Sequence, residues 1–297
     1  MCHHKAPHRN WQPAPKYAHL FDGQTIPEPA NLFDDYSHRS QAALKARMRV
    51  GEDMTKSDVK VDIPKDLKGN DLRRWAYQYY MKDYLRCIQS VDDNVGRMLG
   101  YLKAANLEKD TIVIYTSDQG FFLGDHGWFD KRFMHEESLR MPFLMQYPRE
   151  LKPGGINKDI TLNLDFAELF LDYAGLPAPA GMQGRSFRRN LAGRTPKNWR
   201  QSMYYLYWMH MSNDHQVPGH YGVRTKTHNL IYYYGKALGS TGTSKVDTPP
   251  EWELFDLVKD PGEMSSDYGE PAYANVTATL KQELARLQQQ YKDQPCE

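Results

Sequence analysis

Residues 111–120 read Thr-Ile-Val-Ile-Tyr-Thr-Ser-Asp-Gln-Gly, and this stretch decides the fold. Its first six residues are mostly β-branched, which predicts a buried strand, and its polar end predicts a loop at the carboxyl end of that strand. Upstream, between about Asp71 and Leu107, apolar residues recur at intervals of three and four, which is the pattern of an amphipathic helix. A helix that leads into a buried strand indicates an α/β fold.

The rest of the chain predicts two unequal units. Residues 141–147 are a second strand candidate, and residues 164–174 have a helical period that Gly175 is placed to cap. Beyond about Arg194, aromatic and alternating segments predict a small antiparallel sheet, and a last helix offers an apolar face to cover it. The segments are residues 203–208, 222–234 and 252–257, and the helix covers residues 273–291. We therefore predict a larger unit over residues 1–193 and a smaller one over residues 194–297.

Composition excludes two classes of function. Hydrophobic residues make up 40% of the chain and charged residues 25%, and no run of about 18 apolar residues is present to cross a bilayer. The 38 Lys and Arg residues nearly balance the 37 Asp and Glu residues, so the formal net charge is +1. Such a chain has no global field to attract nucleic acid or anionic lipid. We expect a soluble globular protein without a membrane span or a nucleic-acid partner.

Candidate ligands for a metal ion follow the predicted strand. In open α/β sheets, ligands bind beyond the carboxyl ends of strands, and Asp118 is expected at such an end. Its carboxylate and the amide oxygen of Gln119 are hard oxygen donors, which calcium and magnesium take in proteins. Taken alone, the dipeptide is more typical of a turn that Asp118 caps, with Gln119 in solvent.

The longer run over residues 117–131 resembles the second metal-binding motif of the sulfatase family. In that motif a strand ends in Ser-Asp-His/Asn/Gln-Gly and is followed by Leu-Gly-Glu/Asp-His-Gly and, four residues later, by Lys. Here Leu-Gly-Asp-His-Gly occupies residues 123–127 and the lysine is Lys131. Further segments resemble the family in the same order along the chain: residues 5–9, 181–187, 222–225 and 253–263.

This resemblance implies a fold and a function. The implied fold is an α/β, alkaline-phosphatase-like mixed sheet flanked by helices, followed by a small C-terminal antiparallel sheet packed on a terminal helix. The implied function is a sulfuric ester hydrolase that acts on sulfated glycans or related sulfate esters. Within the family, the sequence most resembles glycan exosulfatases of the N-acetylglucosamine-6-sulfatase type. One divalent ion, Ca²⁺ or alternatively Mg²⁺, and a periplasmic or secreted location are implied as well. The oligomeric state stays open.

Three catalytic tasks follow from the family by position. Asp118 and Gln119 would supply metal ligands, and Lys131 would place its ammonium group against a sulfate oxygen. His8, in a Lys-Ala-Pro-His segment that resembles the family's Lys-Pro-His loop, would protonate the departing alkoxide, a task suited to a group that titrates near neutrality.

Substrate contacts are predicted from three further histidines. His126 would orient its loop or line the pocket, whereas His210 and His220 lie in the strand and loop that border the pocket in the family. Trp208, beside His210, offers a face on which a sugar can stack, although an equally good interpretation has Trp208 fill the interface between the two units.

The family nucleophile is a formylglycine made from Cys or Ser in the motif Cys/Ser-x-Pro-x-Arg, and no such motif occurs in the 297 residues. We expect it, and the rest of the metal ligands, in a segment upstream of Met1. Two other interpretations remain. One is a phosphomonoesterase or phosphonate hydrolase of the same superfamily, and the other is a non-catalytic glycan-binding remnant, since the covalent step needs the nucleophile.

Overall fold

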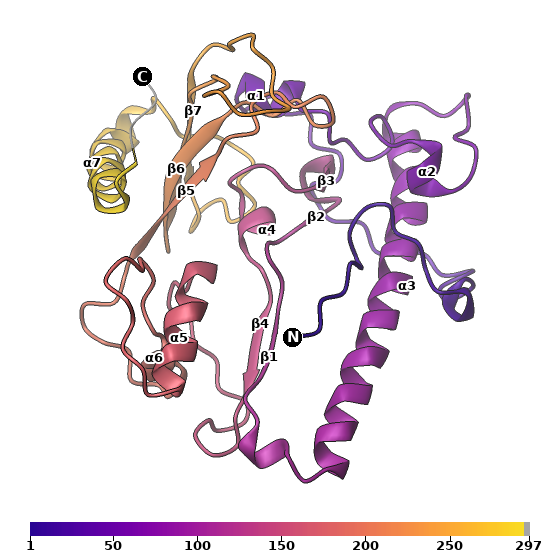
Figure 1. Ribbon diagram of the computed structural model, residues 1–297. Coiled ribbons are helices and arrows are strands. Elements are labelled where there is room, and N and C mark those ends of the chain that lie inside the picture. Colours follow the sequence, from indigo (N-terminus) through magenta and orange to yellow (C-terminus); the bar gives the residue numbers. More distant parts are fainter. Residues whose placement is uncertain (294–297) are drawn as a thin grey trace.

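The computed structural model describes residues 1–293 of the chain. A long helix, α3 (Gly69–Ala104), runs along one side, and the ribbon of β1 (Val113–Thr116) and β4 (Phe143–Gln146) lies beside it (Figure 1). A four-stranded sheet occupies the opposite end of the molecule from the free tip of α3 (Figure 1). Short helices join these parts: α1 (Gln41–Lys45), α2 (Lys56–Val59), α4 (Glu136–Leu139), α5 (Phe166–Tyr173) and α6 (Arg188–Leu191). Single 3₁₀ turns cover Pro15–Tyr17, Glu108–Asp110, Asp125–Gly127, Asn163–Asp165 and Pro271–Tyr273.

Helix α3 confirms the helix predicted over residues 71–107. Up to Val91 the helix buries a stripe at helical spacing, as expected for an amphipathic helix: Ala76, Tyr77, Tyr80, Met81, Cys87 and Val91. This stripe packs against Trp11 and Phe129, which come from segments far away in the sequence. From Met98 onward the stripe is exposed, so the tip of the helix extends beyond the described core.

The expected buried strand is present as β1, but the prediction that it is buried was wrong. Within residues 1–293, β1 pairs only with β4, in an antiparallel register that sets Tyr115 opposite Leu144. Both side chains are exposed, at 37% for Tyr115 and 66% for Leu144. A β-branched run is buried only when strands and helices cover both faces of its sheet. In the described chain this cover is partial: Phe143 and Met145 of β4 pack near Phe166 of α5, but Tyr115 and Leu144 stay exposed.

This open ribbon is expected to make the chain self-associate, because exposed apolar side chains lie on a strand pair whose outer edges meet no other strand among residues 1–293. Leu144→Lys should lower the association seen by sedimentation velocity at high protein concentration, since a charge blunts such an edge. Val258→Lys is the matched control, because Val258 is 71% exposed outside the ribbon and should leave association unchanged. A wild-type chain that stays monomeric at all concentrations would contradict this expectation.

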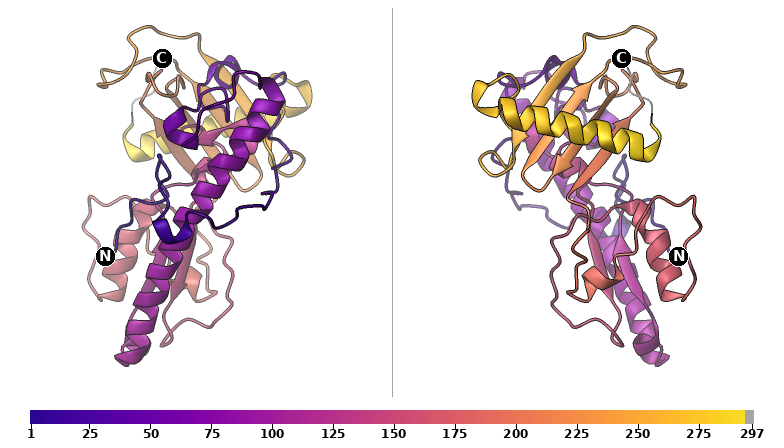
Figure 2. Two further views of the ribbon diagram at one scale, coloured as in Figure 1. Left: turned by 90° about the vertical axis from the view of Figure 1, so that its right-hand side faces the viewer. Right: turned by 90° about the vertical axis from the view of Figure 1, so that its left-hand side faces the viewer.

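The predicted C-terminal sheet and its helix are confirmed. The sheet has the order β5 (Ser202–Tyr207), β6 (His220–Thr225), β7 (His228–Tyr233) and β8 (Glu251–Asp256), and all neighbours are antiparallel. The run at residues 222–234 is split between two strands by a turn at Lys226 and Thr227. Helix α7 (Ala274–Tyr291) lies across one face of the sheet (Figure 2) and buries Leu280, Leu284 and Leu287 there.

The opposite face of this sheet packs on the rest of the chain. Phe133 and Trp128 meet Tyr207, Ile231 and Phe255 from the sheet in one buried cluster. The predicted boundary after residue 193 stays a prediction, and the buried cluster takes side chains from both sides of it. Within the described residues, no helix is long and apolar enough to cross a membrane.

Candidate active site

The loop after β1 carries Asp118 and Gln119. Asp118 is exposed, and the hydroxyl of Ser117 donates to its Oδ1 over 3.2 Å. Gly120 ends the loop against α4, where its N–H donates to the carbonyl of Ser138 over 2.9 Å. A Cβ at position 120 would lie 2.0 Å from the carbonyl oxygen of Glu137, so only glycine allows this close approach. The two predicted metal ligands are therefore held on a loop that is fixed at its far end.

A short hairpin of β2 (Phe122–Leu123) and β3 (Phe129–Asp130) leads from this loop to Lys131. The hairpin is anchored by the buried rings of Phe122, Trp128 and Phe129. Positive φ angles at Asp130 (72°) and Arg132 (132°) turn the backbone sharply on both sides of Lys131. Non-glycine residues adopt such angles only where the surrounding structure fixes them, so the position of Lys131 is tightly determined.

Lys131 is the centre of a cluster of charges. Its side chain is 13% exposed, and its Nζ lies 3.4 Å from Oδ1 of the buried Asp130. Oδ2 of Asp130 lies 2.8 Å from Nε2 of His215 and 3.7 Å from Nη2 of Arg132, whose side chain is 30% exposed. Burial alone would raise the pKa of Asp130, but His215, Arg132 and Lys131 hold that pKa well below its usual range. Asp130 is thus a fixed anion that holds two cationic side chains.

The segment with His8 packs on the same hairpin. Arg9 forms two hydrogen bonds to Asp58, of 2.6 and 2.7 Å, and its guanidinium lies 4.9 Å from the ring centroid of Phe129. Trp11 is fully buried, 4.4 Å from Tyr80 and in edge contact with Phe129 at 6.5 Å, measured between ring centroids. His8 itself is exposed, directly before these anchors in the chain. The structure therefore brings the His8 segment and the Lys131 segment together.

The ring of His8 has a defined proton arrangement. Its Nδ1 lies 2.7 Å from the carbonyl oxygen of Arg9. A carbonyl only accepts hydrogen bonds, so Nδ1 carries a proton in the neutral ring and Nε2 is left to gain or lose the second one. This is the arrangement that a proton donor to a leaving group needs.

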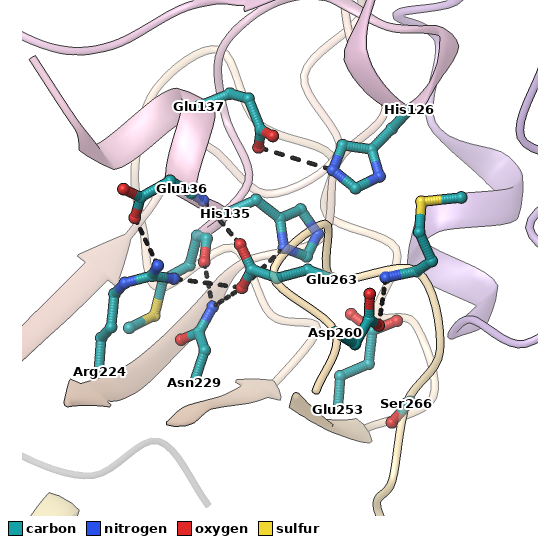
Figure 3. A network of polar contacts seen from close by, with 12 residues as sticks. His126, His135, Glu136, Glu137, Arg224, Asn229, Glu253, Asp260, Glu263 and Ser266 are labelled. Atoms are coloured by element: carbon teal, nitrogen blue, oxygen red, sulfur yellow. Dashed lines mark hydrogen bonds and ion pairs between the residues drawn. The ribbon is translucent and has the colours of Figure 1, made fainter. Parts of the chain in front are cut away.

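His126 is buried rather than open to a ligand. Its Nε2 faces the carboxylate of Glu137 at 3.5 Å (Figure 3), and its Nδ1 lies 3.1 Å from Nη1 of Arg39. Burial alone would lower the pKa of His126, but the carboxylates of Asp34 and Glu137 raise it above its ordinary value. Of the two roles predicted for His126, this environment favours orientation of the loop.

His210 and His220 are both fully buried. His210 accepts the N–H of Gly219 at Nδ1 over 3.1 Å and donates from Nε2 to the carbonyl of Val246 over 3.0 Å. His220 packs among Phe133 and several tyrosine rings, and its burial lowers its pKa to about 4. Their packing gives no support to the predicted contacts with substrate, which stay predictions. Trp208, by contrast, is 53% exposed.

The groups gathered around Asp130, the partner of Lys131, were not predicted from the sequence. Asp130 and Arg132 flank Lys131 in the chain, and this run of three charged residues was a readable signal, but His215, which contacts Asp130 and Arg132, lies 83 residues beyond Arg132. The donor atoms of Asp118 and Gln119 fit a hard cation such as Ca²⁺, which takes six to eight oxygen ligands. Residues 1–293 contain no group of three His, Cys, Asp or Glu side chains able to hold a metal. The two residues would therefore form one part of a coordination shell.

Comparisons with known proteins identify the family of this chain. The family model described as Sulfatase matches residues 1–176, and the model described as N-sulphoglucosamine sulphohydrolase, C-terminal, matches residues 124–290. An N-acetylglucosamine-6-O-sulfatase from Bacteroides thetaiotaomicron is 40% identical over 99% of this chain and 58% of its own length. An extracellular sulfatase homolog from Drosophila melanogaster is 33% identical over 66% of this chain and 16% of its own length.

Solved structures show the same likeness. A protein in complex with its substrate, D-glucosamine-2-N,6-O-disulfate, superposes with a TM-score of 0.89 at 39% identity, covering 98% of this chain and 65% of that chain. A phosphonate monoester hydrolase from Silicibacter pomeroyi superposes with a TM-score of 0.74 at 23% identity, over 96% of this chain and 54% of its own, which shows a shared fold alone. This chain thus spans less than two thirds of the length of these proteins.

Proposed function

This chain belongs to the sulfatase family, and from that premise we propose that it supplies the sulfate-binding and proton-donating part of the active site of a sulfuric ester hydrolase. One observation carries the proposal. The hairpin β2–β3 leads directly into Lys131 and also receives the segment of His8, through Arg9 over the ring of Phe129. A cation and a proton donor from segments far apart in the sequence are thereby anchored on one small element.

Lys131 is suited to bind a sulfate oxygen. Its ammonium group is nearly buried and already oriented by Asp130, so little reorganisation is needed when a sulfate monoester arrives. Arg132, held by the same carboxylate but more exposed, can take a second oxygen of the ester. Two cations around one anion leave a net positive charge where the sulfate would lie.

His8 is suited to protonate the leaving oxygen. With Nδ1–H bonded to the carbonyl of Arg9, the proton to be transferred is held on Nε2 of the imidazolium form. As the bond between sulfur and the bridging oxygen breaks, that proton passes to the sugar oxygen, which leaves as an alcohol and not as an alkoxide.

A divalent cation would be held by the oxygen atoms of Asp118 and Gln119, as far as this chain supplies ligands. When bound, such an ion neutralises part of the charge on the sulfate group. Ca²⁺ suits the carboxylate and amide donors, and Mg²⁺ is the alternative. The amide of Gln119 adds no charge, so both ions would depend mainly on Asp118.

The substrate class that we propose is a sulfated amino sugar or a related sulfated glycan. Support comes from the relative described as an N-acetylglucosamine-6-O-sulfatase and from the solved structure that holds D-glucosamine-2-N,6-O-disulfate. A site of action outside the cytoplasm fits the relative described as an extracellular sulfatase. Fractionation of producing cells would contradict this location if the protein were confined to the cytoplasm.

Binding without turnover tests the proposal, because the chain has no Cys/Ser-x-Pro-x-Arg motif and so a sulfated ligand should persist. We expect titration calorimetry with Ca²⁺ present to detect binding of D-glucosamine-2-N,6-O-disulfate. Lys131→Ala should weaken it by roughly 10- to 100-fold, since hydrogen bonds to charged groups contribute about 1.5–3 kcal/mol.

Two controls accompany this measurement. Lys56→Ala removes an exposed lysine that pairs with Asp62 and should leave binding unchanged. Unsulfated glucosamine should bind weakly to the wild-type chain. Its affinity should be no higher than that of the disulfated sugar for Lys131→Ala. Equal affinity for the sulfated and unsulfated sugars would overturn the proposed role of Lys131.

A further inference from the structure

Beside the candidate site, one arginine contacts a ring nitrogen of each of two stacked histidines. The side chain of Arg39 is fully buried, and the ring centroids of His126 and His135 are 5.2 Å apart, with an angle of 26° between the ring planes. Nη1 of Arg39 lies 3.1 Å from Nδ1 of His126, and Nη2 lies 2.7 Å from Nε2 of His135. One guanidinium therefore contacts both imidazoles.

This geometry determines where the protons of the two neutral rings lie. A guanidinium only donates hydrogen bonds, so each ring nitrogen that faces Arg39 must offer a lone pair. The proton of each neutral ring is then on the other nitrogen, which is Nε2 in His126 and Nδ1 in His135. Those nitrogens face carboxylates: Glu137 Oε2 at 3.5 Å and Glu263 Oε1 at 3.6 Å (Figure 3).

We propose that Arg39 is a positioning residue, which holds His126 and His135 in one fixed tautomer each and so locks the site loop and α4 to the C-terminal sheet. His126 lies within the turn between β2 and β3, and His135 is the residue before α4. Glu263, which faces His135, also accepts the N–H of Glu136 over 2.8 Å and the amide of Asn229 in β7 over 2.6 Å. Through Arg39 and Glu263, the two rings therefore connect the C-terminal sheet to the turn between β2 and β3 and to the start of α4.

The connection reaches the candidate metal ligands through α4. The carbonyl of Glu137 touches Gly120, directly after Asp118 and Gln119, while His126 precedes Lys131 by one short strand. A shift of either ring would move one of these two loops. The relevance of Arg39 to catalysis rests on the proposed function, but the placement of the protons does not.

Four carboxylates surround this group. Besides Glu137 and Glu263, Asp34 Oδ2 lies 3.4 Å from Nη1 of Arg39 and 3.8 Å from Nδ1 of His126, and Glu253 Oε1 in β8 lies 3.5 Å from Nε of Arg39. A second proton on either ring would place an N–H against the guanidinium and break its contact. Burial and the charge of Arg39 lower the pKa of His135. Against the effect of burial, Asp34 and Glu137 raise the pKa of His126, so His126 takes up a proton before His135 on acidification.

Nitrogen NMR tests the inference directly. We would label the chain with ¹⁵N-histidine, record two-bond ¹H–¹⁵N correlations at pH 8.5, and assign the rings with His126→Gln and His135→Gln. His135 should show a protonated Nδ1 and a bare Nε2, and His126 the reverse. His210 is an internal reference, because Gly219 and Val246 fix its proton on Nε2 without Arg39. A wild-type His135 protonated on Nε2 would overturn the proposal.

Arg39→Met then removes the donors while it keeps an unbranched side chain. We expect His135 to lose its single tautomer and His210 to keep its own. Arg74→Met, at a half-exposed arginine that pairs with Glu28, should leave all three rings unchanged. Unaltered tautomers in a folded Arg39→Met chain would overturn the proposal. The affinity of Lys131→Ala for the disulfated sugar tests the proposed function, and the tautomers of His126 and His135 test the role of Arg39. Failure of one proposal can therefore be told from failure of the other.

Discussion

Glu263→Ala is expected to lower the free energy of unfolding by about 3–5 kcal/mol, the cost of removing one partner from a buried charged network. Three donors converge on this buried carboxylate: the amide of Asn229 at 2.6 Å, the N–H of Glu136 at 2.8 Å and Nη1 of Arg224 at 3.2 Å. Alanine removes this shared acceptor from all three (Figure 3), although the amide of Asn229 also donates to the carbonyl of Met134 and Arg224 also pairs with Glu136. Urea unfolding followed by circular dichroism measures the loss.

The loss should depend on pH in one direction. Burial alone would raise the pKa of Glu263, but His135 and Arg224 hold that pKa well below its usual range. A carboxyl with a depressed pKa contributes its full stability above its unfolded pKa, about 4.3, and loses it as the pH falls further. Wild type and variant should therefore converge in strongly acidic solution. Glu270→Ala, at an exposed glutamate that also follows β8 in the chain, should stay within about 0.5 kcal/mol of wild type.

His8→Ala is expected to slow hydrolysis of sugar sulfates by about two to four powers of ten, the usual contribution of a general acid. The rate can be measured in a chimera that joins the formylglycine-bearing part of a sulfatase to residues 1–297. An alkoxide is a poor leaving group and needs the proton that Nε2 of His8 would give. A nitrophenoxide leaves without it, so nitrophenyl sulfate should be affected far less.

His19→Ala is the matched control for this comparison. His19 is also exposed, and its ring pairs with Asp22 at 2.9 Å, away from the hairpin of Lys131. Both substrates should be hydrolysed at the rate of the parent chimera. Equal losses on sugar and nitrophenyl sulfates in His8→Ala would remove His8 as the proton donor and leave it a role in sulfate positioning.

Elements with a long periodic pattern could be predicted from the sequence. Helices α3 and α7 and the C-terminal strands follow their apolar spacing, because that spacing records which side faces a core. The burial of β1 could not be predicted in the same way. Its side chains have the composition of a covered strand, but cover depends on neighbours that the described chain provides only in part.

The candidate site was predictable where its residues are consecutive. The spacing from Asp118 to Lys131 is a local signal, whereas the contact between Arg39 and His135 joins residues 96 positions apart. His210 was read from its aromatic neighbours in sequence, but its ring nitrogens bind backbone groups of Gly219 and Val246. A single sequence does not show which distant residue a histidine contacts. The contacts of Arg39 with His126 and His135 could therefore be found only in the folded structure.

The link between Ser40 and Glu253 has a consequence for synthesis of the protein on the ribosome. The N–H of Ser40 donates to the carboxylate of Glu253 over 2.8 Å, across 213 positions of the chain. Translation at about 5–20 residues per second separates the emergence of these two residues by roughly 10–40 s. For that interval Ala43 and Met48, buried in the finished fold, have no sheet to pack on. The nascent chain therefore presents this early segment to chaperones until its last strand has been made.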